Sequence, residues 1–392
     1  MIFDRPRAAV TLGGFCAFID LYAPQAVLPQ LSESLGISPA SAGGMVGVST
    51  LAIACSAPFV GMLADRIGKK TTILGAMFLL LLPTTMLVQA SSLNEILVWR
   101  FVQGLLLPAI FSPLVAYVSE EWSPGQAADI IGLYTAGSAI GGFSGRFVTA
   151  LMADHFGWRA GFGVLAVVTL AGAVAMWAWL PAGRRRIKAP DDLPGGLGAA
   201  LGHLRNPALL ATCAAGFALL FSMVATFTYV NFYLARPPYS LNSAQLGMIF
   251  LVYLIGAAIT PVSGPVVRRL GRRKAMVMAI GFACVGLSFT LLAPLPAIVG
   301  GLAIYVTGVF LAQSVAMGFV GQAARSAKAT AVGLYVCTYY VGGSVGAVLP
   351  GLLVWQSGGW AGCVSLILAV MCGSGGTAWW AWRDERRLCP AE

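Results

Sequence analysis

The chain has 392 residues, of which 58% are hydrophobic and only 10% are charged, and its mean hydropathy is +0.83. Soluble domains carry about 25% charged residues, so this composition excludes a water-soluble globular protein and indicates an integral membrane protein. The net charge of +10 does not indicate nucleic-acid binding, because the basic residues are confined to short loops between apolar runs.

The sequence contains no pattern typical of an enzyme or a metal site. Its eight cysteines show no CxxC or Cys/His spacing, and we interpret them as small buried residues. Nucleophile elbows and phosphate-binding loops are absent from the sequence, which also excludes ATP-driven transport. We therefore predict a protein that is not an enzyme and has no metal or cofactor.

Hydrophobic runs long enough to cross a bilayer recur along the whole chain. A spanning helix needs about 20 apolar residues. Runs of this kind lie at 8–29, 42–63, 71–90, 94–118, 127–151, 158–181, 208–235, 243–267, 275–295, 297–321, 328–355 and 359–382. The predicted fold is an all-α integral membrane protein with twelve transmembrane helices. Two six-helix bundles, 1–183 and 207–392, are joined by a linker, 184–206.

The basic residues predict the orientation of these spans. Of the 24 lysines and arginines, only Arg159 and Arg236 fall on one side of the membrane, and Arg100 and Arg146 fall within spans. All the others lie on the opposite side, together with both termini. Loops rich in Lys and Arg stay in the cytoplasm, so we predict that both termini are cytoplasmic.

The two halves of the sequence repeat each other. The charged hairpin Gly61–Lys70 recurs in degraded form as Gly264–Arg273, 203 residues later. Gly132-Leu133-Tyr134 at the start of the fifth span recurs as Gly333-Leu334-Tyr335 at the start of the eleventh. Parallel repeats of six spans predict two pseudo-repeats around a central cavity.

Several motifs carry a resemblance to a known family. The hairpin Gly61-Met-Leu-Ala-Asp-Arg-Ile-Gly-Lys-Lys70 resembles the loop signature of the major facilitator superfamily, and Arg100-x-x-Gln103-Gly104 resembles its fourth-helix signature. Tyr22-Ala-Pro-Gln25 and the Gly132–Arg146 run look closest to the acriflavine-sensitivity branch of twelve-span bacterial drug efflux permeases. One departure concerns the drug-antiporter motif of the fifth helix, whose Gly-Pro is absent because Ser138 follows Gly137.

The resemblance implies a secondary transporter of the bacterial inner membrane. Its partners would be a small-molecule substrate, protons and the lipid bilayer, and the proton gradient would be its energy source. We expect a monomer.

Three charged residues lie well inside predicted spans, namely Asp20, Arg100 and Arg146. A charge there costs about 2.5–3.5 kcal/mol on insertion scales, so each is a candidate functional residue. We predict that all three take part in proton coupling, and the resemblance implies this role for Arg100. Asp20 could instead form a fixed structural pair with an arginine, and Arg146 could instead bind an anionic group of the substrate.

The hairpin between the second and third spans is the predicted conformational lock, formed by Gly61, Asp65, Arg66, Gly68 and Lys69. The resemblance implies that Asp65 contacts the N-terminus of the eleventh helix, where the helix dipole favours an anion. Gly61 would permit a close approach and Gly68 a turn. The second hairpin has Arg268 in place of Asp65, so we expect a lock on one side only.

Polar and aromatic residues of the predicted cavity would contact the substrate, although aromatic residues at helical spacing also serve packing. The predicted set is Tyr22, Gln25, Gln103, Tyr134, Tyr335 and Tyr339. These side chains suit an amphipathic or aromatic substrate.

The function predicted from the sequence is proton-coupled efflux of small amphipathic or cationic compounds. An alternative is export or uptake of a small polar metabolite such as a sugar or an organic anion. This alternative is favoured because the predicted spans contain two arginines and only one aspartate. A membrane sensor that does not transport is a remote alternative, because a sensor should carry a soluble output domain and the longest predicted loop has only about 26 residues.

Overall fold

The structure, a computed structural model, describes residues 4–183, 202–324 and 327–384. Within these ranges every regular element is a helix. Nine candidate spans there are long and apolar enough to cross a membrane, and a tenth would be the helix pair Ser243–Ile259 and Ser263–Leu270, which is bent by 55°. The all-helical membrane fold is thereby confirmed, whereas the layout of twelve spans in two repeats stays a prediction. Most of the predicted linker, 184–201, lies outside the described residues.

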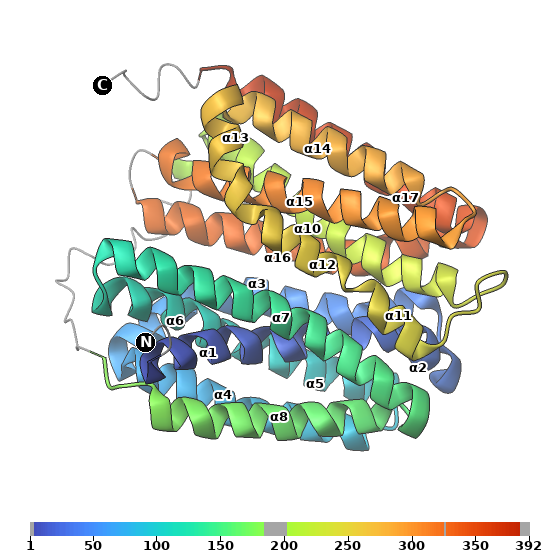
Figure 1. Cartoon of the computed structure of the whole chain (residues 1–392), viewed down its shortest axis with the longest axis horizontal. Helices are drawn as coiled ribbons and strands as arrows, with labels where there is room; N and C mark the ends of the chain where they lie inside the picture. Colours follow the sequence, from blue (N-terminus) through green and yellow to red (C-terminus); the bar gives the residue numbers. More distant parts are fainter. Residues whose placement is uncertain (1–3, 184–201, 325–326, 385–392) are drawn as a thin grey trace. The chain divides into compact units, whose positions relative to one another are not determined.

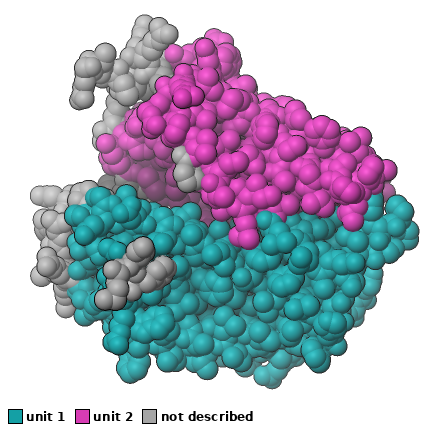
Figure 2. Space-filling view, viewed as in Figure 1, with its two compact units in different colours: residues 1–188, 231–251 teal, residues 189–230, 252–392 magenta. Residues whose placement is uncertain are grey.

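The chain forms two compact units, coloured separately in Figure 2. Unit 1 comprises Met1–Lys188 and Asn231–Leu251, and unit 2 comprises Ala189–Val230 and Val252–Glu392. Unit 1 therefore includes a short piece of the second predicted bundle.

The α-helices of the two units are labelled in Figure 1. Those of unit 1 are α1 (Arg5–Leu21), η1 (Ala23–Val27), α2 (Leu28–Leu35), α3 (Pro39–Ile67), α4 (Lys69–Gln89), α5 (Leu93–Leu106), α6 (Pro108–Glu121), α7 (Pro124–Phe156), α8 (Trp158–Trp179) and α11 (Ser243–Ile249). Helix α10 (Pro207–Leu234) begins in unit 2 and ends in unit 1. The others of unit 2 are α12 (Val252–Ile259), η3 (Thr260–Val262), α13 (Ser263–Leu270), α14 (Arg272–Phe289), α15 (Leu295–Ala323), α16 (Lys328–Leu353), α17 (Trp355–Ala381) and η4 (Trp382–Asp384).

The first predicted span is broken near its middle. Helix α1 ends at Leu21, and the chain continues through the short η1 before α2 begins. Pro24 explains the break, because it has no N–H to give the carbonyl of Asp20, four residues earlier. The fourth predicted span is likewise divided into α5 and α6 immediately before Pro108. The sequence analysis did not predict either break.

Glycines let the backbones of α1 and α7 approach closely. A Cβ on Gly141 would collide with the carbonyl oxygen of Phe15, and one on Gly145 with that of Ile19. Unit 2 has a matching contact, since a Cβ on Gly346 of α16 would collide with the carbonyl oxygen of Phe221 in α10. Small residues at such contacts let membrane helices pack through their backbones. The glycines that repeat in the sequence thus make matching helix contacts in the two units.

We predict that Gly145→Ala destabilises the protein by about 1–3 kcal/mol, because the added methyl would overpack the contact with α1. Gly163→Ala is the matched control, since a Cβ there would meet no described atom within 4 Å and alanine favours a helix over glycine. Thermal unfolding of the purified proteins measures the difference. Equal melting temperatures for the two variants would show that the α1–α7 contact tolerates a side chain.

Candidate functional site

Arg100 binds the broken end of α1. Its guanidinium, which is fully buried, donates through Nη1 to the carbonyl of Asp20 at 2.9 Å and through Nη2 to the carbonyl of Leu21. Its Nε donates to the carbonyl of Met45 in α3 at 3.1 Å. The break at Pro24 leaves the Asp20 carbonyl without a helical donor, and Arg100 supplies one. The side chain therefore joins α5 to both α1 and α3.

The carboxylate of Asp20 binds a side chain of another helix. It is 1% exposed, and its Oδ2 accepts a hydrogen bond of 2.8 Å from the hydroxyl of Thr169 in α8. Its Oδ1 is buried and makes no hydrogen bond to a described residue. Arg100 contacts the main chain of Asp20 rather than its carboxylate. Asp20 is thus a buried acid held by one neutral donor.

Gln103 extends this network to α4. Its side-chain oxygen accepts from Arg100 at 2.7 Å, and its Nε2 donates to the hydroxyl of Thr84 in α4 at 2.8 Å. Asp20, Arg100 and Gln103, which were predicted separately, therefore belong to one buried polar cluster. The sequence analysis missed Thr84 and Thr169. Threonine is common in membrane helices, and nothing in their local sequence marks them as partners of a charge.

Arg146 lies in a different place, among side chains of α7, η1 and α11. It is 2% exposed. Its Nε donates to the side-chain oxygen of Gln25 at 3.0 Å, and its Nη1 donates to the carbonyl of Gly142 at 2.7 Å. The guanidinium carbon lies 4.6 Å from the centre of the Tyr22 ring and 4.8 Å from that of Phe250. Two aromatic faces, an amide and a carbonyl thus surround this cation.

Residues of the second predicted bundle complete this part of unit 1. Asn231 at the end of α10 donates to the carbonyl of Gln25 at 2.8 Å, and Asn242 before α11 donates to Asp154 at 3.3 Å. A Cβ on Gly247 of α11 would press on Ala150 of α7. The Arg146 surroundings therefore bring together Tyr22 and Gln25, two predicted cavity residues, with Asn231 and Phe250, which were not in the predicted site.

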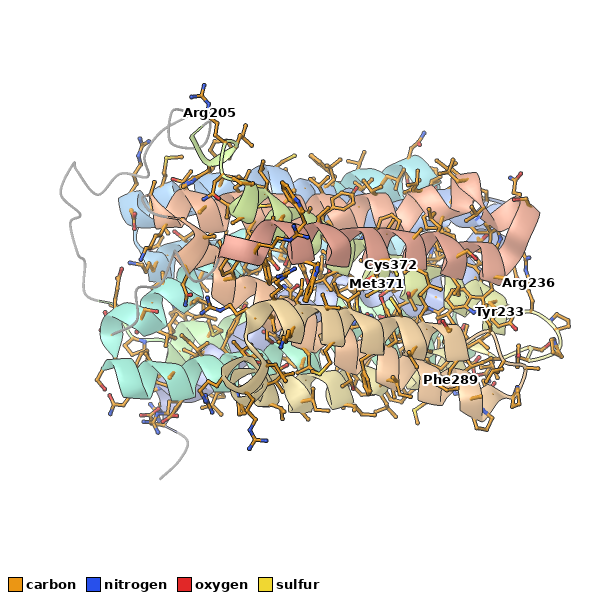
Figure 3. The ribbon with its side chains drawn as sticks, turned by 90° about the horizontal axis from the view of Figure 1, so that it is seen from above. Arg205, Tyr233, Arg236, Phe289, Met371 and Cys372 are labelled. Atoms are coloured by element: carbon orange, nitrogen blue, oxygen red, sulfur yellow. The ribbon has the colours of Figure 1, made fainter. Side chains whose placement is uncertain are left out.

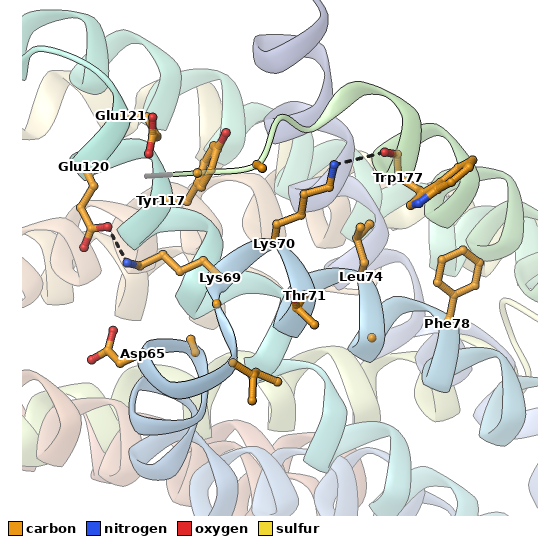
Figure 4. A pocket seen from close by; sticks show the side chains of 16 residues that line it. Asp65, Lys69, Lys70, Thr71, Leu74, Phe78, Tyr117, Glu120, Glu121 and Trp177 are labelled. Atoms are coloured by element: carbon orange, nitrogen blue, oxygen red, sulfur yellow. Dashed lines mark hydrogen bonds and ion pairs between the residues drawn. The ribbon is translucent and has the colours of Figure 1, made fainter. Parts of the chain in front are cut away.

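Three residues of the predicted lock, Asp65, Gly68 and Lys69, line an open cavity of about 480 Å³ at the α3–α4 hairpin. Gly68 joins the two helices with a φ of 94°, which favours glycine, so the predicted turn is present. Lys69 forms an ion pair of 2.5 Å with Glu120 at the end of α6, and Figure 4 shows both side chains with Asp65 beside them. Arg66 precedes this turn in α3. A Cβ on Gly61 would meet no described atom within 4 Å, so the reason for a glycine there stays a prediction.

The remaining predicted cavity residues lie elsewhere. Tyr134 is on α7 and its ring packs beside Gly14 of α1 in unit 1. Tyr335 and Tyr339 are on α16 in unit 2, where their rings stack with centres 6.1 Å apart. The hydroxyl of Tyr335 donates to Gln313 at 3.3 Å. Their contact with a substrate stays a prediction.

The comparison with known families gives a clear match. Residues 10–347 and 238–388 match the model of the Major Facilitator Superfamily. The chain belongs to this superfamily. Its relatives include the uncharacterized MFS-type transporter YybF of Bacillus subtilis, which is 34% identical over 93% of this chain and 90% of that protein. The inner membrane transport protein YnfM of Escherichia coli is 32% identical over 95% and 90%, respectively. The chain is therefore a multi-pass membrane transporter by family.

Solved structures agree with the fold. A bacterial homolog of the human lysosomal transporter Spinster, in an inward-facing and unoccupied conformation, has a TM-score of 0.80 at 15% identity and 98% coverage of both chains. The nucleoside transporter NupG has a TM-score of 0.78 at 14% identity, covering 96% of this chain and all of that one. At these identities the likeness concerns the fold alone. The acriflavine-sensitivity branch and the roles of the site residues stay predictions.

We predict that Lys69 and Glu120 stabilise the α3–α4 hairpin as a pair. Lys69→Glu places like charges together and should lower the melting temperature and the transport rate, and Lys69→Glu with Glu120→Lys should recover most of both. A double-mutant cycle on thermal unfolding should give a coupling of about 1 kcal/mol, since both side chains are partly exposed. Independent effects of the two substitutions would contradict the pairing.

Proposed function

We propose that the chain couples the efflux of small amphipathic or cationic compounds to the entry of protons. The family supplies transport by alternating access as the general activity, and the buried polar cluster around Asp20 supplies a group that can carry a proton. A single carboxylate on a membrane helix is the simplest acceptor for one proton in each transport cycle.

The observation that carries this proposal is the surroundings of the Asp20 carboxylate. One oxygen has a hydroxyl donor in Thr169, the other has no hydrogen bond to a described residue, and the side chain is buried. A carboxylate held by several cations would keep its charge throughout the cycle. Asp20 instead has one neutral donor, so it can gain a proton on Oδ1 and lose it again without breaking an ion pair.

Arg100 and Gln103 would act as positioning residues in this cycle. Arg100 fixes the main chain at Asp20 and Leu21, and Gln103 fixes Arg100 against Thr84. A change in the angle between α1 and α5 would move the Asp20 carboxylate relative to Thr169. Protonation and helix movement would then be linked through the same few bonds.

The proposed substrate class follows from the side chains predicted to contact it. Tyr22, Gln25, Tyr134, Tyr335 and Tyr339 offer aromatic faces, hydroxyls and an amide. Such groups bind amphipathic and cationic compounds through stacking, cation–π contacts and hydrogen bonds. This proposal also places the chain with drug efflux permeases of the inner membrane.

A second candidate function is transport of a small anionic metabolite, and Arg146 favours it. A buried guanidinium is expensive to maintain, and Arg146 donates to the Gln25 side-chain amide and the Gly142 carbonyl and lies over two aromatic rings. An anionic substrate could displace the Gln25 side chain and take its place on the cation.

We predict that Asp20→Asn abolishes gradient-driven transport, because asparagine mimics the neutral acid and cannot release a proton. Exchange of labelled for unlabelled substrate across proteoliposomes should continue within about threefold of the original rate. Asp129→Asn, at an exposed acid of α7, is the control and should leave both rates unchanged. A growth screen of an overexpressing strain, with and without a protonophore, first supplies the substrate.

Survival of proton-driven accumulation in Asp20→Asn would remove this residue from coupling. Loss of both accumulation and exchange, in a variant that still folds by its melting temperature, would instead assign Asp20 to the structure of the α1 break. The two results separate a coupling role from a structural one.

The two substrate classes are separated by Arg146→Gln. If the substrate is anionic, the variant should bind it more weakly by about 1.5–3 kcal/mol, the range for a hydrogen bond to a charged group. If the substrate is cationic, its binding should be unchanged or stronger. Arg159→Gln, at an exposed arginine of α8, controls for the loss of one positive charge. Binding titrations with one anionic and one cationic compound from the screen decide between the classes.

A further inference from the structure

The α13 helix of unit 2 lies outside the core of its bundle. None of its residues, Ser263–Leu270, is buried. Its axis is bent by 55° from the preceding segment Ser243–Ile259. That segment is about 26 Å long, at a helical rise of 1.5 Å per residue. That segment alone comes close to the thickness of the hydrocarbon layer, about 30 Å. The bent α13 therefore begins where the span reaches the membrane surface.

The sequence of α13 is amphipathic. Val262, Val266 and Leu270 are four residues apart and so follow one stripe of the helical surface, while Arg268 and Arg269 lie off that stripe. Val262 is 47% exposed and Leu270 is 42% exposed. A short helix with exposed apolar residues on one side and cations on the other is typical of segments that lie in the membrane interface.

The charged residues of α13 and of the first turn of α14 are all basic. Five basic residues follow each other closely in its last turn and at the start of α14, namely Arg268, Arg269, Arg272, Arg273 and Lys274. The sequence contains no Asp or Glu at any position between Asp192 and Asp384. From 202 to 383 the described part of unit 2 therefore contains no acidic residue.

Aromatic side chains adjoin the cations. The Arg273 guanidinium lies 3.5 Å from the centre of the Trp379 ring of α17, and that of Arg272 lies 5.5 Å from the Phe319 ring of α15. Trp380, beside Trp379, is 63% exposed. In Figure 3, Arg205 marks this end of unit 2, and Phe289 at the far end of α14 marks the opposite one. Tryptophan is enriched at the level of lipid headgroups.

We propose that α13 and the cations Arg268–Lys274 form a binding surface for anionic phospholipid headgroups. The apolar stripe of Val262, Val266 and Leu270 would enter the headgroup layer, and the exposed Arg268, Arg269 and Lys274 would bind phosphates. Arg272 and Arg273, which rest on aromatic rings, would hold α14 at the same depth.

Charge complementarity favours an anionic lipid over a zwitterionic one. Phosphatidylethanolamine presents an ammonium beside its phosphate, and none of the residues from Val262 to Lys274 is acidic. The first hairpin differs in this respect, because Asp65, Glu120 and Glu121 lie beside its lysines. A lipid such as phosphatidylglycerol, with a net negative charge, therefore fits the α13 surface better.

The test compares two variants that each remove two charges from the same end of unit 2. Arg268→Gln with Arg269→Gln alters the proposed surface, and Arg205→Gln with Lys328→Gln is the matched control. Each full-length protein is placed in nanodiscs of phosphatidylcholine with 30 mol% phosphatidylglycerol, and the lipids retained after extraction are counted by mass spectrometry. The wild type and the control should retain phosphatidylglycerol preferentially. In the α13 variant, the preference for phosphatidylglycerol should fall about fivefold for each arginine removed.

A second measurement tests the position of the helix. Leu270→Cys, labelled with an environment-sensitive dye, should shift to shorter emission wavelengths when phosphatidylglycerol is added and should shift back in high salt. The proposal is overturned if the wild type shows no preference for the anionic lipid, or if both charge variants lose it equally. It is also overturned if the label at 270 stays in water in every lipid mixture.

Discussion

The structure of unit 1 depends on how the main-chain carbonyls at the break in α1 find hydrogen-bond donors. Pro24 removes a main-chain donor in the middle of an apolar bundle, where an unpaired carbonyl costs several kcal/mol. Arg100 provides two donors at that point, and its third contact reaches Met45 of α3. A buried cation and a broken helix, each costly alone, thus compensate each other. The position of the Asp20 carboxylate follows, because Arg100 fixes the main chain from which it extends.

Unit 2 contains a corresponding helix contact without a buried charge. The contact of Gly145 with Ile19 corresponds to that of Gly346 with Phe221, so the position of Asp20 corresponds to Ser222. Ser222 is fully buried and its hydroxyl donates to the carbonyl of Leu219 in its own helix. Helix α10 also continues unbroken through this position, so its carbonyls need no arginine from another helix. Of these two corresponding positions, only the one in unit 1 carries an acid.

The sequence identified the buried charges but not their partners. Asp20, Arg100 and Arg146 stand out because a charge in an apolar run is rare, and Gly68 stands out because a hairpin needs a residue with positive φ. Thr169 and Phe250 do not stand out, since threonine and phenylalanine are ordinary in membrane helices. Their roles depend on which helices meet, and that requires the packing of α8 on α1 and of α11 on α7. Pro24 is visible in the sequence, but its effect becomes clear only in the structure, where the Asp20 carbonyl accepts a hydrogen bond from Arg100.

The two hairpins show how one local geometry can serve different interactions. Gly68 and Gly271 have φ values of 94° and 74° and join successive helices in the same way. Lys69 in the first hairpin turns inward to Glu120, so its charge is neutralised inside unit 1. The second hairpin has Arg268 where the first has Asp65, and α13 presents its cations outward instead. The turn is kept because the backbone requires glycine, while the side chains around it decide whether a cation pairs with an acid, as Lys69 does, or faces outward, as Arg268 and Arg269 do.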